Sequence, residues 1–371
     1  MNSLFSAKDL RKLIIPLIFE QALAITVGMA DTMMISSVGE AAVSGVSLVD
    51  MINILMFNIM AALATGGAVV TSQCLGARHK EDARRSARQL LYTVIFAGVL
   101  IGLIVVLLRR PMLHLFFGSI EADVMENALI YLTISAFSFP FLAVYNACAA
   151  LFRSMGNSQI TLKVSILINL INVAGNAICI FGLHMGAAGV AIPSLISRAV
   201  GSIVLYVLLR NPALDICFVK ESFHLDPGMV KKILYIGIPS GVENGIFQLG
   251  RVLVVSIISG FGTVQIAANG VANNLDSVGI LVGQAVNLAM ITVIGQCVGA
   301  GDEKQVRLYT KKLIILAYIP TIALNIVLFL ILNPVLGLYG LSDETTRLAR
   351  ILVFIHNGCA CFLWPLSFTL P

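Results

Sequence analysis

Charged residues are scarce in this chain. They account for 12% of its 371 residues, whereas a soluble domain carries roughly a quarter. Hydrophobic residues account for 58%, so too few polar side chains remain to cover the surface of a soluble protein of this length. The composition therefore excludes a soluble globular protein and indicates an integral membrane protein.

The sequence also lacks the short motifs of several enzyme classes. It has no CxxC, no HExxH and no cluster of Cys and His at zinc spacing. It has neither a GxxxxGK(S/T) phosphate loop nor a GxSxG nucleophile elbow. We therefore expect no enzymatic activity and no cofactor, so any transport would draw its energy from a gradient of Na⁺ or H⁺. The net charge of +5 requires no nucleic acid, because basic loops facing an anionic leaflet account for it.

Long apolar segments take up most of the sequence. Each is about 20 residues long, which is enough to cross a hydrocarbon core of ~30 Å as a helix. Their length and continuity exclude barrel strands, and Gly, Pro, Asn or clustered charges separate them. The predicted fold class is an all-α integral membrane protein with about ten spans, near 13–35, 45–74, 89–108, 129–151, 164–182, 187–209, 233–258, 268–297, 312–332 and 349–371.

Residues 13–90 recur without a gap 223 positions later. Unrelated apolar stretches can share Leu and Val by chance, but they do not readily share Pro, Glu and a QCxGA box at one offset. The sequence therefore contains a duplicated unit. Its matches include Ile15-Pro16 with Ile238-Pro239, Glu20 with Glu243, Gln73-Cys74 with Gln296-Cys297, and Gly76-Ala77 with Gly299-Ala300.

The repeat predicts how the chain is divided. Six spans separate equivalent points, an even number, so both halves should insert with the same orientation about a pseudo-twofold axis along the membrane normal. We expect a six-helix bundle at 1–209, a cytoplasmic linker at 210–232, and a second bundle at 233–371 that holds four helices and lacks its last two. An ancient duplication retained only for packing is the alternative, since parallel repeats also build channels and structural bundles.

The distribution of basic residues predicts the orientation. Most of the 24 Lys and Arg residues fall in alternate connections, and cytoplasmic loops carry such an excess. This places the N-terminus in the cytoplasm together with the loops at 75–88, 152–163, 210–232 and 298–311.

Five acidic residues are predicted at membrane depth, where ionisable groups are costly and usually functional. They are Glu20, Asp31, Asp50, Glu243 and Asp276, with Arg198 and Arg251 as the embedded cations. Glu20 and Glu243 are repeat mates, so two facing carboxylates could bind a cationic substrate or share a proton. Alternatively, both lie near the ends of their helices and are simply hydrated.

Asp31 has no acidic mate, because Val254 occupies the equivalent position. An unmatched acid suits a single coupling-ion site in one half, although a helix-terminal acid in contact with water is equally compatible. For Asp50 and Asp276 a helix-start or interface role is favoured. In the fifth span, Asn169, Asn172 and Asn176 share one helix face. They could coordinate an ion or a drug, but hydrogen bonding between helices is the favoured interpretation.

Several motifs together are similar to those of the multidrug and toxic compound extrusion (MATE) family. They cover nearly the whole chain in the family's order, and they are specific as a set rather than singly. The motifs are IPLIFEQALAITVGMADTMMIS, VGEAAVSGVS, TSQCLGAR, CAALFRSMGNSQITLKVSILINLINVAGNAICIFG, GAAGVAIPSLISR, IPSGVENGIFQLGRVLVVSIISGFG and VIGQCVGAGD.

The resemblance implies two six-helix bundles in a V, which export organic cations in exchange for Na⁺ or H⁺. Asp31 in ADTMMI matches the coupling carboxylate of similar bacterial proteins. Their fifth helix carries Asn and then Asp four residues later, whereas this chain has Asn172 and Asn176. In another branch an acid lies in the middle of the seventh helix, where this chain has Gln248, with Glu243 as a substitute. The candidate substrate- and ion-binding residues are Asp31, Glu20, Glu243, Asn172, Asn176, Gln248 and Ser194, with Asp31 and Asn172 as a possible Na⁺ site.

Length is the largest departure from the family, whose members usually have twelve helices. This chain stops at FLWPLSFTLP, inside the expected tenth helix, so we expect a fragment or a truncated protein. The predicted function is a cation-coupled antiporter for organic cations and drugs, monomeric in the bilayer of the plasma membrane. The alternatives are a lipid-linked oligosaccharide flippase of the same superfamily, disfavoured by the few embedded Arg and Lys, and a truncated membrane protein without transport activity.

Overall fold

Every regular element that the computed structural model describes, over residues 4–117, 121–218, 224–259, 261–338 and 342–369, is a helix. Nine helices in these ranges are long and apolar enough to cross a membrane, so the predicted all-α membrane fold is confirmed. The elements are α1 (Ala7–Ser36), α2 (Glu40–Gly76), α3 (Lys80–Phe117), α4 (Ala122–Ser154), α5 (Ser158–Ala177), a π-helical turn η1 (Ile178–Gly182), α6 (Ala188–Leu208), α7 (Pro227–Ser259), α8 (Thr263–Gly279), α9 (Leu281–Gly299), α10 (Glu303–Leu330), α11 (Leu332–Leu338) and α12 (Asp343–Thr369).

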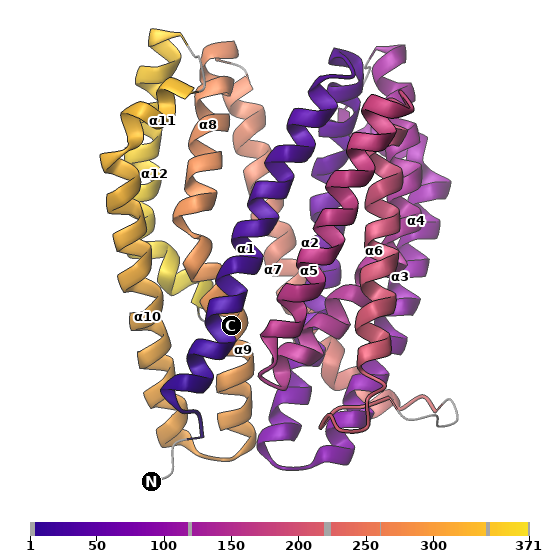
Figure 1. Ribbon diagram of the computed structural model, residues 1–371, viewed down its shortest axis with the longest axis vertical. Coiled ribbons are helices and arrows are strands. Elements are labelled where there is room, and N and C mark those ends of the chain that lie inside the picture. Colours follow the sequence, from indigo (N-terminus) through magenta and orange to yellow (C-terminus); the bar gives the residue numbers. More distant parts are fainter. Residues whose placement is uncertain (1–3, 118–120, 219–223, 260, 339–341, 370–371) are drawn as a thin grey trace.

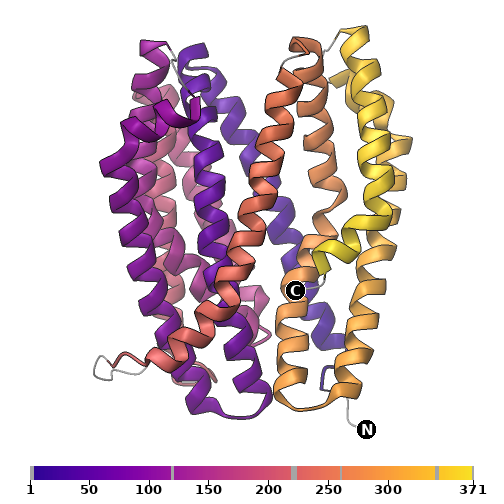
Figure 2. The same cartoon turned by 180° about the vertical axis from the view of Figure 1, so that it is seen from behind.

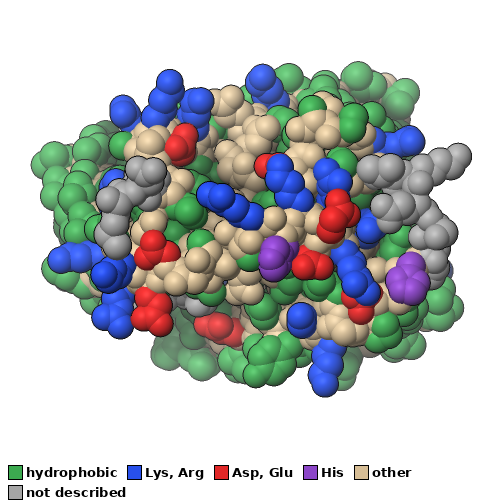
Figure 3. Space-filling view, turned by 90° about the horizontal axis from the view of Figure 1, so that it is seen from below, with side chains coloured by type: hydrophobic (Ala, Val, Ile, Leu, Met, Phe, Trp, Pro, Cys, Tyr) green, Lys and Arg blue, Asp and Glu red, His purple; other side chains and the backbone are tan. Residues whose placement is uncertain are grey.

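The helices form two bundles arranged in a V (Figure 1). The first contains α2–α6 and the second α8–α12. They lie close together at the end that carries the N-terminus and separate toward the other end, as the view from behind also shows (Figure 2). Lys and Arg side chains are spread over the face at the converging end (Figure 3), which we call the basic end.

Helices α1 and α7 each run diagonally from one bundle to the other (Figures 1 and 2). The apolar residues of the first turns of α1 recur at helical spacing, which gives that helix an apolar stripe. This stripe, Leu10, Leu13, Ile14 and Leu17, is buried against α9 and α10 of the second bundle. Further along, α1 contacts α5 of the first bundle. A movement of α1 would therefore change its contacts with both bundles.

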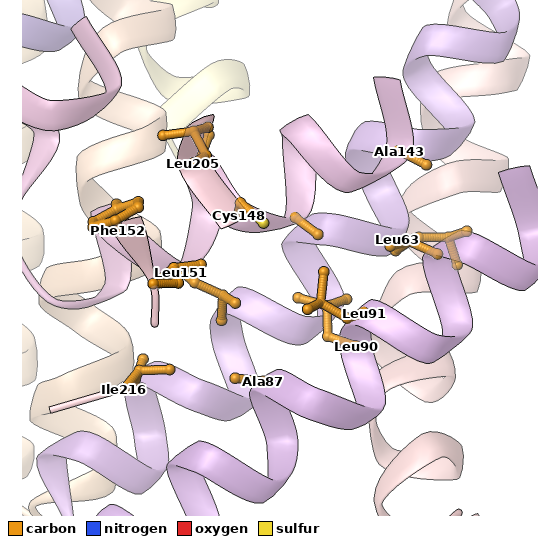
Figure 4. Close-up of a cluster of buried hydrophobic side chains, with 14 of the residues drawn as sticks. Leu63, Ala87, Leu90, Leu91, Ala143, Cys148, Leu151, Phe152, Leu205 and Ile216 are labelled. Atoms are coloured by element: carbon orange, nitrogen blue, oxygen red, sulfur yellow. The ribbon is translucent and has the colours of Figure 1, made fainter. Parts of the chain in front are cut away.

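The first turns of α7 likewise pack into the bundle formed by the other half of the chain. Ile233, which follows Leu10 by 223 positions, is fully buried in the core of the first bundle. That core includes residues of α2, α3, α4 and α6, among them the fully buried Leu90, Leu151 and Phe152 (Figure 4). Each bundle is thus completed at the basic end by the first turns of a helix from the other half of the chain.

The two QCxGA boxes meet at the basic end. A Cβ atom on Gly76 would overlap the backbone carbonyl of Gln296, and one on Gly299 would overlap that of Gln73. Because 223 residues separate both pairs of equivalents, each box touches the other through the same residues. This reciprocal contact is what a twofold axis between the halves produces, so the predicted pseudo-twofold relation is confirmed.

The span predicted at 268–297 is interrupted in the structure. Helix α8 ends at Gly279 and α9 begins at Leu281, whereas the equivalent helix α2 runs without a break from Glu40 to Gly76. Asn325 donates a hydrogen bond of 3.1 Å to the carbonyl oxygen of Gly279. A side chain that bonds to a helix carbonyl competes with the backbone ladder, which is a recognised cause of a helix break. Apolar periodicity could not reveal this competition, because it arises from a distant helix.

The connection between the halves is shorter than the predicted linker at 210–232. Helix α7 begins at Pro227, five residues before the predicted end of that segment. Asp226 accepts hydrogen bonds from the backbone N–H groups of Gly228 and Met229, so it acts as an N-cap with Pro in the first helical position. The division of the chain into domains at 209 and 232 stays a prediction.

Candidate functional site

A chain of polar contacts joins α1 to α5 and α6 of the first bundle. Asn176 of α5 donates a hydrogen bond of 2.7 Å to Asp31 of α1 and a longer one of 3.4 Å to Asn172. Asn172 in turn donates to the hydroxyl of Ser194 on α6 at 2.9 Å. Asn172 and Asn176 lie one turn apart on α5, so the four-residue spacing places both amides on one face. Four of the seven candidate residues are therefore brought together.

The oxygens of this cluster fit the coupling ion that the resemblance implies. Asn176 is fully buried, and its Oδ1 has no hydrogen-bond partner among the described residues. The neighbouring acceptors are the Asp31 carboxylate and Asn172 Oδ1. Carboxylate and amide oxygens are the ligands that hard cations prefer. Asp31, Asn172 and Asn176 could therefore hold Na⁺, while Asp31 alone could hold a proton.

A second carboxylate belongs to the same polar region. Asp50 of α2 accepts a hydrogen bond of 3.0 Å from the Tyr131 hydroxyl and one of 3.4 Å from Asn53. The interpretation of Asp50 as a helix-start residue is wrong, because α2 begins ten residues earlier, at Glu40. Its interface role is borne out by Tyr131, which lies on α4. The sequence signal for this partnership was weak, since these helices are far apart along the chain.

Arg198 of α6 connects the two acids. Its guanidinium donates a hydrogen bond of 2.6 Å to the hydroxyl of Ser138 on α4. It interacts electrostatically with Asp31, Asp50 and Tyr131. Sequence reasoning identified Arg198 as an embedded cation but assigned it no partner. The structure adds a positive charge to the ion site, which reduces the repulsion between the two carboxylates.

Glu20 lies in a different environment from Asp31. It forms an ion pair of 3.4 Å with Arg153 at the end of α4, and both side chains are at most 14% exposed. The Thr161 hydroxyl of α5 donates a further hydrogen bond of 3.0 Å to it. Glu20 is thus tied to the first bundle by partners that the sequence did not reveal.

The structure does not bring Glu243 to Glu20. Glu243 is exposed on α7, and no hydrogen bond or ion pair joins the two carboxylates among the described residues. Gln248, one turn further along α7, is half-buried. The structure therefore shows no direct contact between the two carboxylates that were predicted to face each other. Both side chains nevertheless belong to helices that cross between the bundles.

Known proteins resemble the chain in sequence over most of its length. Residues 16–178 and 239–365 match the MatE family. An uncharacterized transporter, YisQ of Bacillus subtilis, is 27% identical over 91% of this chain and 75% of its own length. A probable multidrug resistance protein, NorM of Thermotoga maritima, is 26% identical over 96% of this chain and 77% of its own length. The chain thus spans about three quarters of these relatives.

Solved structures share the fold. A crystal structure of MATE in complex with MaL6 superposes with a TM-score of 0.91 at 19% identity, covering 98% of this chain and 81% of the other. An outward-facing MATE family transporter of the MOP superfamily superposes with a TM-score of 0.88 at 20% identity, covering 98% and 80%. Since the family match covers both halves of the repeat, the chain belongs to the MATE family of membrane transporters.

Proposed function

We propose that this chain exports organic cations across a bacterial plasma membrane in exchange for Na⁺ or H⁺, by alternating access. Multi-pass helices and bacterial relatives named as multidrug resistance proteins support the membrane and the general substrate class. The ion-coupled exchange rests on one observation. Asp31, hydrogen-bonded to Asn176, lies on α1, the helix whose first turns are packed in the other bundle.

This placement links ion binding to the relation between the bundles. An ion can shift a conformational equilibrium only by binding one state more tightly than the other. An ion held between α1 and α5 would fix the C-terminal part of α1 against the first bundle. The first turns of α1 would remain packed against α9 and α10. Release of the ion would free α1 to tilt, and the two bundles would move with it.

We assign the basic end to the cytoplasm because cytoplasmic loops carry an excess of Lys and Arg, and the N-terminus lies at the same end. In this orientation the bundles are closed toward the cytoplasm and apart toward the outside. A cavity at the junction of α2, α4 and α9 has a volume of only about 60 Å³, which holds a water molecule or two but no organic cation. The structure corresponds to a form that has closed its cytoplasmic entrance. Glu243, exposed on α7, is available to attract a cationic substrate.

Replacement of Asp31 by Asn tests the coupling. The variant keeps the size of the side chain and removes its charge, so it should abolish gradient-driven efflux while leaving the folded protein intact. Ethidium efflux from vesicles under an imposed Na⁺ or proton gradient measures this, and the comparison of the two gradients identifies the ion.

The matched control is Asp123→Asn, which removes an exposed acid at the start of α4 and should transport like the wild type. Thermal unfolding of both variants would show whether lost activity reflects lost folding. Efflux at the wild-type rate by Asp31→Asn would refute the coupling assignment.

A further inference from the structure

A groove of about 560 Å³ follows the first turns of α7. These turns lie at the basic end, on the near side of the molecule in Figure 2. The lining side chains are spaced three or four residues apart along the helix, so they form one stripe. They include Leu225, Val230, Lys231, Leu234, Tyr235 and Ile238. The stripe is therefore apolar apart from one ammonium group and one phenol.

The opposite face of the same turns is fixed on the first bundle. Ile233 is fully buried, and a Cβ atom on Gly66 of α2 would overlap its backbone carbonyl. The residues before α7 are held as well. Gln89 of α3 donates a hydrogen bond of 2.7 Å to the carbonyl oxygen of His224 and accepts one of 3.0 Å from the N–H of Asp226. The groove is thus a preformed feature of the fold.

The corresponding stripe of α1 is basic instead of apolar. Leu234 and Tyr235 follow Arg11 and Lys12 by 223 positions. Both helices bury their opposite faces in the bundle of the other half. Helix packing therefore accounts for the buried faces, but it does not explain why the exposed face of α7 has become apolar. This difference indicates an apolar partner that α7 has and α1 lacks.

The position of the groove suits a membrane lipid. Helix α7 begins at Pro227, and it rises by about 16 Å from there to Ile238. This length accommodates most of one extended acyl chain. Ile238 is 53% exposed and Tyr235 is 80% exposed, and Tyr is enriched where the hydrocarbon core meets the headgroups. The groove therefore extends from headgroup depth into the apolar part of the leaflet.

Lys231 supplies the charge that selects the headgroup. Its side chain is exposed, and it forms no ion pair within the described part of the chain. The nearest acid along the chain, Asp226, is already paired with Arg85 at 2.8 Å and caps the first N–H groups of α7. The ammonium group is thus available to an external anion, and basic pockets beside transmembrane helices bind anionic headgroups.

We propose that this groove binds one anionic phospholipid from the leaflet at the basic end. The lipid phosphate contacts the Lys231 ammonium and the Tyr235 hydroxyl, which lie one turn apart on the same face. One acyl chain lies along Leu234 and Ile238. A zwitterionic lipid such as phosphatidylcholine carries its own ammonium group, which Lys231 repels. The proposal depends on the position of α7 in the membrane and not on ion coupling, so it goes beyond the proposed function.

Quenching of tryptophan fluorescence by brominated lipids tests the site in liposomes that contain the full chain. Trp364, the only tryptophan, is replaced by Phe, and Tyr235→Trp places a reporter in the groove that keeps an aromatic ring and a hydrogen-bond donor. Bromine quenches tryptophan on contact, so lipid mixtures give the relative binding constant of each headgroup. We expect phosphatidylglycerol to bind roughly fivefold more tightly than phosphatidylcholine, the effect of one Lys beside an anionic headgroup. Lys231→Gln should remove this preference, and Lys231→Arg should keep it.

The matched control is Lys232→Gln, because Lys232 is also exposed on the same turn but does not line the groove. It should keep the preference for phosphatidylglycerol. The same loss in both glutamine variants would mean that the whole basic surface attracts anionic lipid, which would overturn the proposal. Equal quenching by the two headgroups would also overturn it, since the groove would then accept any lipid of the bilayer. Absence of quenching by either lipid would show that the groove holds no lipid at all.

Discussion

Replacement of Gly76 by Ala should prevent the two bundles from closing at the basic end. The added Cβ would overlap the backbone carbonyl of Gln296, and a rotamer change cannot relieve a clash with main-chain atoms. Overpacking of this kind costs about 1–3 kcal/mol, and each 1.4 kcal/mol changes the ratio of closed to open forms about tenfold. Pulsed electron–electron double resonance between spin labels at His79 and Glu303, both exposed just beyond the two boxes, should report a longer distance than in the wild type. Efflux measured in vesicles should be slower.

The pseudo-twofold axis supplies an internal check on this result. Gly299→Ala meets Gln73 through the equivalent contact, so it should lengthen the same distance by a similar amount. Gly283→Ala is the control, because a Cβ there meets nothing within 4 Å although the residue lies on the same helix, α9. Equal distances in all three variants would mean that the boxes do not hold the basic end closed.

The sequence could predict features that depend on local spacing or on the repeat. The QCxGA box matched at one offset, and the two copies prove to touch each other. Asn172 and Asn176 were placed on one face by their four-residue spacing, and both lie in the polar cluster that contains Asp31. These predictions needed only helix geometry and the assumption that equivalent segments fold alike.

Partners from distant helices could not be predicted in the same way. The ion pair of Glu20 with Arg153 joins residues 133 positions apart, and the offset instead suggested Glu243 as the partner. The break at Gly279 depends on Asn325, which is 46 residues away. Neither interaction leaves a periodic signal, because each is determined by how helices pack rather than by the order of residues along one helix.

Replacement of Arg198 by Met should strongly destabilise the first bundle. The guanidinium donates to Ser138 and interacts with Asp31 and Asp50. Removal of one partner from a buried charged group leaves the other charge uncompensated, which costs about 3–5 kcal/mol. The midpoint of thermal unfolding in nanodiscs should fall accordingly. Arg198→Lys should recover part of the loss, because it keeps the charge but not the planar guanidinium.

Two comparisons separate this charge effect from a general intolerance of substitution. Arg251→Met removes the other embedded arginine, whose side chain is exposed on α7, and should change stability by only about 0.5 kcal/mol. Asp50→Asn added to Arg198→Met should restore part of the stability, since it removes one of the two carboxylates left without a counter-charge. If the two arginine variants were equally stable, or if Asp50→Asn further destabilised the double variant, Arg198 would not be the counter-charge of the first bundle. A rescue would show that Arg198 compensates the Asp50 carboxylate next to Asp31, the residue that takes up the coupling ion in the proposed mechanism.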